Sequence, residues 1–403
     1  MSESMTDAIA LDAREPMRAE PLETAGLAAL IGVAGALQFS IAAAQILLAI
    51  ALVCWLLLLI VRRDRFEAPH FFWPLLAYAG VTLFSAVLSS DVRTSLVDSK
   101  QLVLFLVVPV AYRFVSRSRA PMLMTVILTC AAVSAAYGIV QYGILHYDYL
   151  GHRPQGTLGH YMTYSGLLML VIAIAIARVL FGRGERTWAA LVIPALTVAV
   201  ALTFSRSATV GVCAAAALLF SLKDFRLFAI APVAAAIFFA LAPGQITQRF
   251  VSMFDTKDPT RRDRVAMLWE GERMILAHPL TGVGPNMVER RYAEYRGPDA
   301  VNDVNPHLHN VPIQIAAERG LPALAIWLWF IVTLVRDAWR RFKDGTDRFL
   351  PAAALAATTA MLTAGLFEYN FGDSEFLMLF LIVATLPFTL ERREKLTAHV
   401  SVQ

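Results

Sequence analysis

The segment TAGLAALIGVAGALQFSIAAAQILLAIALVCWLLLLIVRR (residues 24–63) decides the fold, because it stays apolar from residue 24 to residue 61 before ending in two arginines. A helix needs about 20 residues to cross the hydrocarbon core of a bilayer, so one helix of this length would overshoot it. We therefore expect two crossings, separated near Gln38–Ser40. The whole chain is 58% hydrophobic and 16% charged, with a mean hydropathy of +0.59, which is typical of a polytopic membrane protein and not of a soluble domain.

Similar apolar stretches recur along the chain, separated by polar connections. Twelve are predicted to be membrane-crossing helices, at residues 24–40, 42–61, 70–89, 99–112, 121–145, 161–181, 187–204, 207–222, 225–242, 312–335, 349–367 and 375–390. None of them alternates with period 2, and the bilayer excludes open sheet edges. The predicted fold class is therefore all-α: a polytopic membrane helical bundle of about 12 transmembrane helices, with one long outer segment that contains amphipathic helices.

Basic residues divide the connections between the two sides of the membrane. Lys and Arg form eight short clusters, and seven lie on the same side if the N-terminus is cytoplasmic, as the positive-inside rule requires. The predicted organisation is a cytoplasmic N-terminal tail at 1–23, transmembrane helices 1–9 at 24–242, an outer segment at 243–311, transmembrane helices 10–12 at 312–390 and a cytoplasmic C-terminal tail at 391–403. The eighth cluster lies in the outer segment, which makes that segment the first place to look for function.

The apolar run after Asn310 is interrupted by Glu318, Arg319, Gly320 and Pro322. Proline and charged residues both disfavour an unbroken helix inside the bilayer. We expect a short helix at the outer surface and a crossing that begins near Gly320.

Four arginines in the outer connections are candidate ligand-binding residues: Arg153, Arg206, Arg264 and Arg273. The last two lie on a predicted amphipathic helix at about 261–277. Its pattern is formed by Val265, Leu268, Trp269, Glu272, Ile275 and Leu276. Guanidinium groups suit phosphate oxygens, so outer arginines without matching acids indicate an anionic ligand. The alternatives are that Arg206 extends its charge to the membrane interface and that Arg153 anchors phospholipid headgroups.

His307 and His309 flank Leu308 at the entrance to an apolar helix. A neutral imidazole is a suitable general base for a sugar hydroxyl, and the alternatives are a structural hydrogen bond or helix cap and metal ligation. An H-x-H pair without a neighbouring Cys or carboxylate cluster is a weak metal pattern, so no metal and no cofactor is predicted. The chain has no G-x-S-x-G, C-x-x-C, Walker or H-E-x-x-H motif, which argues against the hydrolase, redox, nucleotide-driven and zinc-protease classes.

Several outer motifs together resemble the O-antigen ligase and polymerase superfamily. They are RPQGTLGHYMTYSG (153–166), the Ser-Arg-Ser of 205–207, and RVAMLWEGERMILAHPLTGVGPN (264–286) followed by HLHNVPIQIAAERGLPAL (307–324). The most specific part is the pattern of His309, Asn310, Glu318 and Gly320, together with the preceding H-P-L-T-G-V-G-P block.

The resemblance implies a metal-independent glycosyltransferase of the bacterial inner membrane, with segment 243–311 and the active site in the periplasm. It implies a glycan donor carried on undecaprenyl diphosphate, His309 as the catalytic base, and Arg206 and Arg264 as ligands of the diphosphate. Arg153 is a third arginine of that site. The secondary candidates are Arg273, His307, Glu368 and Asp373.

Within the superfamily, the length of 403 residues and the single long outer segment favour an O-antigen ligase, which joins O-antigen to the lipid A-core by an inverting displacement. The alternatives are an O-antigen polymerase, a protein O-oligosaccharyltransferase and, outside the enzymes, a flippase or channel for anionic lipids. Membrane lipids are expected partners. No nucleic-acid partner is expected, because the basic residues behind the net charge of +4 are spread over the inner membrane face.

Overall fold

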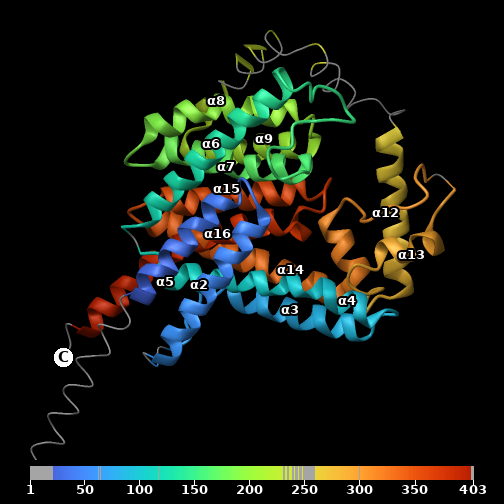
Figure 1. Ribbon diagram of the computed structural model, residues 1–403, viewed down its shortest axis with the longest axis horizontal. Coiled ribbons are helices and arrows are strands. Elements are labelled where there is room, and N and C mark those ends of the chain that lie inside the picture. The colour runs from blue at the N-terminus through green and yellow to red at the C-terminus, as the bar shows by residue number, and fades with distance from the viewer. Residues whose placement is uncertain are drawn as a thin grey trace, which may run out of the picture.

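Figure 1 shows the computed structural model, which describes residues 21–229 and 259–400 apart from 62, 64, 117 and 299, and also residues 232, 233, 236, 237, 240, 244 and 247. Every regular element in these ranges is a helix; the one extended pairing is an isolated bridge between Tyr149 and His152. The helices are Pro21–Ala36, α2 (Ile41–Val61), α3 (Phe72–Val87), α4 (Val92–Ser99), η1 (Lys100–Leu106), α5 (Val107–Phe114), α6 (Ala120–Gly143), α7 (Tyr161–Phe181), α8 (Arg186–Leu202), α9 (Arg206–Lys223), η2 (Phe225–Ala229), α12 (Pro259–Ala277), α13 (Val288–Tyr295), α14 (Val311–Asp344), α15 (Phe349–Ala364), η4 (Asn370–Gly372) and α16 (Ser374–Val400).

The all-helical fold class and the membrane character of the chain are confirmed. Six helical spans in the described residues are long and apolar enough to cross a bilayer, and five further apolar helices are shorter. Each of these spans falls on one of the predicted stretches, and a turn at residues 37–39 separates the first two, where the sequence predicted a break. The ninth predicted helix, 225–242, is described only at residues 225–229, 232, 233, 236, 237 and 240, so the number of twelve stays a prediction.

The predicted start of the fourth span is wrong. The fourth span runs over Val92–Phe114 and not 99–112, because Asp91 caps a polar first turn by accepting a hydrogen bond from Thr94 N at 3.0 Å. The last helix continues to Val400, and its apolar part, Ser374–Thr389, agrees with the crossing predicted at 375–390. Hydropathy marks where an apolar surface ends, whereas the helix ends only where its backbone pattern is broken.

The middle of the bundle is formed by α7, α15 and α16, most of whose residues are buried. Figure 1 shows α15 and α16 between a layer that contains α6, α8 and α9 and a layer that contains α3 and α14. The outer helix α12 runs across the ends of α3 and α14 and not alongside them. It therefore lies at one end of the bundle and packs against α14.

Helix α14 is broken at Gly320, whose φ of 82° is outside the helical range, and this confirms the interruption expected there. The H-P-L-T-G-V-G-P block binds the carbonyls that the break exposes. Val283 N donates to Ala317 O at 2.8 Å, and Gly284 N donates to Glu318 O at 2.9 Å. The block thus replaces the hydrogen bonds that a continuous helix would have made, as buried backbone requires.

The glycines of this block are needed for that close contact. A Cβ built on Gly282 would lie 2.2 Å from the backbone carbon of Glu318, and one on Gly320 would lie 2.4 Å from Leu280 O. Both residues also have positive φ, which side chains other than glycine rarely adopt. The contact fixes the outer segment against the start of α14, and so fixes the chain that carries the two histidines.

Candidate active site

The turn from His307 to Asn310 is held in place by Leu308 and Asn310. Leu308 is buried and packs in the small core between α12 and the start of α14, while its backbone N donates to Gln314 Oε1 at 2.7 Å. Asn310 caps α14 by accepting from Ile313 N at 3.0 Å and donates its side-chain N–H to Leu366 O. The residue between the two histidines therefore points into the protein, and both imidazoles point the other way.

The two imidazoles meet at one carboxylate. His307 Nε2 lies 3.0 Å from Glu368 Oε1, and His309 Nδ1 lies 3.0 Å from Glu368 Oε2. His309 adopts a left-handed backbone with φ of 49°, an uncommon conformation that turns its ring back toward His307. The ring centroids of the two histidines are 4.2 Å apart. Glu368, a secondary candidate from the sequence, is thus the residue that joins the pair.

Glu368 is ionised in this setting. Burial on its own raises the pKa of the carboxyl, but hydrogen bonds from His307 and His309 together hold it well below its usual range. A carboxylate only accepts hydrogen bonds, so His309 carries its proton on Nδ1 and leaves the lone pair of Nε2 free for a substrate proton. The arrangement is that of two imidazoles oriented by one carboxylate.

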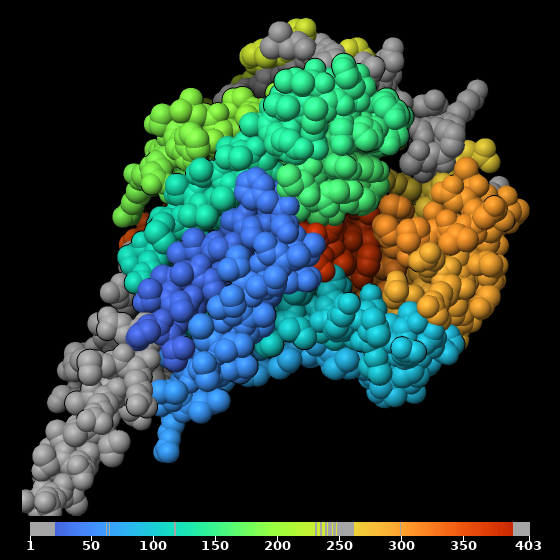
Figure 2. Space-filling view, viewed as in Figure 1, coloured from blue at the N-terminus to red at the C-terminus, as the bar shows by residue number. Residues whose placement is uncertain are grey.

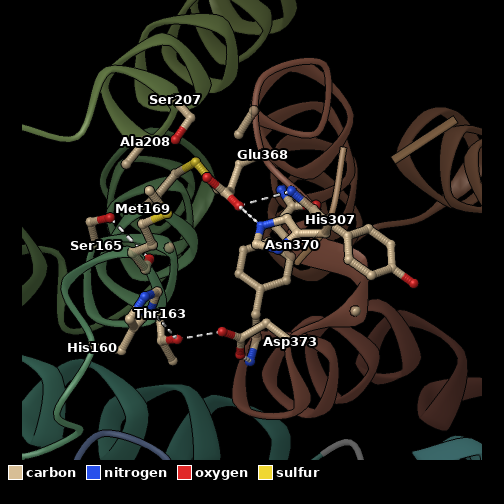
Figure 3. Close-up of a pocket in the computed structure, with 16 residues that line it drawn as sticks. His160, Thr163, Ser165, Met169, Ser207, Ala208, His307, Glu368, Asn370 and Asp373 are labelled. Atoms are coloured by element: carbon tan, nitrogen blue, oxygen red, sulfur yellow. Dashed lines mark hydrogen bonds and ion pairs between the residues drawn. The ribbon is translucent and has the colours of Figure 1, made fainter. Parts of the chain in front are cut away.

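A cavity of about 230 Å³ lies beside this cluster and is lined from α7, α9 and the connection between α15 and α16. Figure 3 shows His307 and Glu368 on one side, Ser207 and Ala208 from α9 above, and His160 with Thr163 from α7 below. Methionine and aromatic side chains complete the wall. The cavity is therefore a mostly apolar space with a few converging polar groups, as substrate sites usually are.

A second polar pair closes the cavity opposite Glu368. Thr163 Oγ1 donates to Asp373 Oδ2, and His160 Nδ1 lies 3.3 Å from Thr163 Oγ1. Asp373 also accepts from Phe376 N at 3.0 Å and so caps α16. Asp373, a secondary candidate from the sequence, therefore lies in the cavity wall with a structural contact of its own.

Two of the candidate arginines lie close together beside α9. Arg206 is the first residue of α9, directly before the cavity residues Ser207 and Ala208. The Arg153 guanidinium lies 4.1 Å from the ring centroid of Tyr161. Burial lowers the pKa of Arg153, Tyr161 opposes that change, and Arg206 lowers the pKa further because the two positive charges are near one another. The pair and the positive end of the α9 dipole form an electropositive corner at the start of α9, next to the cavity residues Ser207 and Ala208.

The turn that carries Arg153 is fixed by a buried glutamine. Gln141 of α6 accepts from Gly156 N at 2.9 Å and from Gln155 N at 3.0 Å, and donates to Gly156 O at 2.8 Å. Gly156 has φ of 61°, and a Cβ there would meet the Tyr164 ring at 2.9 Å. The RPQG sequence is therefore a rigid turn that places Arg153 at the start of α7.

The other two candidate arginines are on α12. Arg264 is partly buried and follows Asp263, whose carboxylate accepts from Val301 N at 3.0 Å and from Asn302 N at 3.1 Å. Arg273 donates to Tyr295 O at 3.2 Å at the end of α13. Arg273 thus has a structural contact away from the cavity, and Arg264 lies on the helix that packs against Leu308.

The helix predicted at about 261–277 is present as α12, but the apolar positions of its predicted pattern do not face the protein. Val265, Leu268, Trp269 and Leu276 are exposed, whereas Met267 and Met274 are buried against the bundle. Gly271 lies on the buried face, where a Cβ would meet Ile313 at 2.3 Å and Leu308 at 2.9 Å. The exposed row suits the membrane interface, where apolar residues of a surface helix enter the lipid.

A larger groove of about 1080 Å³ adjoins the cavity. Figure 2 shows red chain in a hollow bounded by blue, green, orange and cyan parts of the chain. The groove is lined from α2, from α4, from Asn286 and Arg290, and from Gly372 and Ser374 before and at the start of α16. Leu48, Leu52 and Val97 give the groove an apolar wall, and the exposed Arg93 and Lys100 lie at its polar side.

The groove and the cavity share one residue, Gly372. The side chain of Gln101 bridges to this point, donating to Gly372 O at 2.5 Å and to Ser374 Oγ at 3.0 Å. The loop at Gly372 and the side chain of Gln101 thus lie between the groove and the cavity.

Sequence reasoning missed several of these residues. His160 and Thr163 lie within the RPQGTLGHYMTYSG motif, whose position at the start of the predicted membrane-crossing helix 161–181 was the available signal. Asp98 and the buried pair Glu318–Arg319 form a charged cluster behind the site, with 2.6 Å between Arg319 NH1 and Glu318 Oε2 and 3.7 Å between Arg319 NH2 and Asp98 Oδ2. Glu318 and Arg319 both lie in the motif stretch 307–324, whereas Asp98 on α4, the partner of Arg319, has no local signal.

Comparison with known proteins bears on the identity of this site. Residues 189–328 match a family model described as O-antigen ligase, and the match includes Arg206, Arg264, His307 and His309. No curated protein matches the chain. The resemblance to the O-antigen ligase superfamily is confirmed over the matched stretch. It implies a glycosyltransferase-like enzyme of the ligase and polymerase kind, with lipid-linked glycans and membrane lipids as its general class of substrates.

Proposed function

We propose, from the O-antigen ligase match and the His–Glu–His cluster beside the cavity, that the protein transfers a finished O-antigen glycan from undecaprenyl diphosphate to the lipid A-core. The observation that carries the proposal is the contact of His309 Nδ1 with Glu368 at 3.0 Å, which presents the other ring nitrogen as a base. The reaction takes place at the periplasmic face of a bacterial inner membrane, and both termini are cytoplasmic.

The donor diphosphate occupies the electropositive corner. Arg206 and Arg153 lie beside the first turn of α9, and Arg264 contributes from α12. Forked guanidinium donors neutralise the charge that develops on the diphosphate as its bond to the anomeric carbon breaks, which is the role of a divalent cation in metal-dependent transferases. The exposed apolar row of α12 keeps this site next to the lipid from which the donor arrives.

His309 activates the acceptor. Its Nε2 takes the proton of the acceptor hydroxyl while the oxygen attacks the anomeric carbon, and undecaprenyl diphosphate leaves from the opposite face. Glu368 holds the imidazole in the required tautomer and stabilises the imidazolium that forms. One displacement of this kind inverts the anomeric configuration and needs no covalent enzyme intermediate.

The groove beside the cavity is our proposed site for the lipid acceptor. A phosphorylated glycolipid has acyl chains that suit the apolar wall of α2 and α4 and anionic groups that suit Arg93 and Lys100. The junction at Gly372 and Gln101 then brings its sugar toward His309.

Charge reversal in the groove is expected to weaken acceptor use selectively. The double variant Arg93→Glu/Lys100→Glu should raise the KM for lipid A-core about 10-fold, equivalent to about 1.4 kcal/mol, because two exposed cations are replaced by anions. The turnover number at saturating acceptor and the Kd for the donor should stay within about twofold. Arg340→Glu/Lys343→Glu, at the far end of α14, is the matched control. An unchanged KM in the groove variant would exclude the groove as the acceptor site.

The decisive test is transfer by the purified protein in proteoliposomes that contain a lipid-linked glycan and one acceptor at a time. Lipid A-core, a second lipid-linked glycan and an acceptor protein distinguish a ligase from a polymerase and from a protein O-oligosaccharyltransferase. Glycosylated lipid A-core is expected, and activity should persist in EDTA because arginines take the place of a cation. Lipid movement without a new glycosidic bond would identify the flippase or channel class instead.

A further inference from the structure

The two histidines and the glutamate also form the donor set of a metal site, which the sequence pattern alone did not predict. One ligand atom from each of His307, His309 and Glu368 lies within 4.8 Å of the other two. The carboxylate is 3.0 Å from His307 Nε2 and 3.0 Å from His309 Nδ1. Ligand atoms around a tetrahedral zinc ion are about 3.3 Å apart, given bond lengths near 2.0–2.1 Å. The spacing between the carboxylate and each imidazole is therefore already close to the spacing of two ligands around one zinc ion.

We propose that His307 Nε2, His309 Nδ1 and Glu368 bind a zinc ion, and that this ion inhibits transfer. Two imidazoles and one carboxylate are a common set of zinc ligands, with the fourth position left open. Here the cluster borders the cavity, since His307 and Glu368 both line it, so a water molecule or a substrate oxygen has access to that position. The inhibition, but not the binding, rests on the proposed function of His309.

The surroundings hold the three ligands in place before an ion binds. Leu308 and Asn310 fix the backbone between and after the two histidines. Tyr369 N donates to Glu368 Oε1 at 3.1 Å, which orients the carboxylate from behind. Groups that hydrogen-bond a ligand in this way raise metal affinity, because less ordering is needed on binding.

The inhibition follows from the two nitrogens of His309. Without a metal, Nδ1 carries the proton donated to Glu368, and Nε2 has the lone pair that accepts the proton of the acceptor hydroxyl. Zinc needs the lone pair of Nδ1, so the ring takes the tautomer in which Nδ1 has given its proton to solvent and Nε2 has taken one up. A neutral imidazole with zinc on Nδ1 has Nε2–H, which donates a hydrogen bond and cannot take up a proton. The same contact that prepares the base thus makes it sensitive to zinc.

The test measures zinc binding apart from activity. The purified, metal-free full-length protein in detergent is titrated calorimetrically with zinc chloride, alongside H307A, E368Q and the control H70A. His70 is an exposed histidine that lies 3.6 Å from Asp337 and away from the cavity. We expect one zinc ion per chain, with a Kd at least 10-fold weaker in H307A and in E368Q and unchanged in H70A. Equal binding in all four proteins would overturn the proposed site.

The second measurement connects binding to transfer. Zinc is expected to inhibit glycan transfer by the unmodified protein at concentrations near its Kd, and EDTA should restore the rate. In H307A the inhibitory concentration should rise in parallel with the Kd, whatever the residual rate of that variant. Zinc that binds the cluster without inhibition, or that is required for transfer, would overturn the inhibitory role. A His309→Ala variant with normal transfer would instead refute the assignment of the base and leave the calorimetric result intact.

Discussion

His309→Ala is expected to lower the turnover number for glycan transfer by about 10²- to 10⁴-fold, the range typical for loss of a general base. Donor binding should change little, because the imidazole acts on the acceptor proton and the diphosphate is held by arginines. The measurement is single-turnover transfer from a radiolabelled donor to lipid A-core, together with the Kd for the donor, on purified variants with matched thermal unfolding.

His307→Ala serves as the matched control, since its side chain contacts the same carboxylate at the same distance of 3.0 Å. Its loss removes one hydrogen bond to Glu368 but leaves the bond from His309, so a smaller reduction in turnover is expected. Near-normal turnover in His309→Ala contradicts the assignment, and so does a loss of donor binding as complete as that of Arg264→Ala. In either case the acceptor is activated by another group.

The sequence predicted the local features of this protein well. Apolar stretches located the helices, and the sequence around Gly320 predicted the break in α14 because glycine, proline and charge act on the backbone next to them. The order of the motifs also identified His309 and Arg206 as candidates. Each of these inferences depends on residues that are close in the chain.

Contacts between distant segments were beyond the reach of the same reasoning. Glu368 meets His309 across 59 residues, and Thr163 meets Asp373 across 210 residues. No periodicity in the sequence specifies such pairs, because they depend on how the helices pack. The exposure of Trp269 on α12 could not be predicted for the same reason. The helical spacing of the apolar residues was evident in the sequence, but the face that packs against the bundle carries the small residue Gly271 and the flexible residue Met274.

Arg206→Lys and Arg264→Lys are each expected to slow transfer by about 30- to 1,000-fold. A lysine keeps the positive charge but loses the planar fork that binds two phosphate oxygens together. Loss of such a contact, made most strongly as the diphosphate leaves, costs on the order of 2–4 kcal/mol in the transition state. The two arginines lie on different helices. Arg206 is the first residue of α9, beside the cavity residue Ser207, whereas Arg264 is on α12.

Arg273→Lys is the control for the Arg264 variant, because it is on the same helix and its guanidinium donates to Tyr295 O. Its transfer rate should stay within about threefold of the unmodified protein, since an ammonium group can still donate one hydrogen bond to a carbonyl. The measurements are single-turnover rates and donor affinities for the three variants. If Arg273→Lys is as slow as Arg264→Lys, the loss comes from the packing of α12 and not from a contact with the diphosphate. A normal rate in Arg264→Lys would limit the diphosphate site to Arg206 and Arg153, the two arginines whose charges already lie near one another at the start of α9.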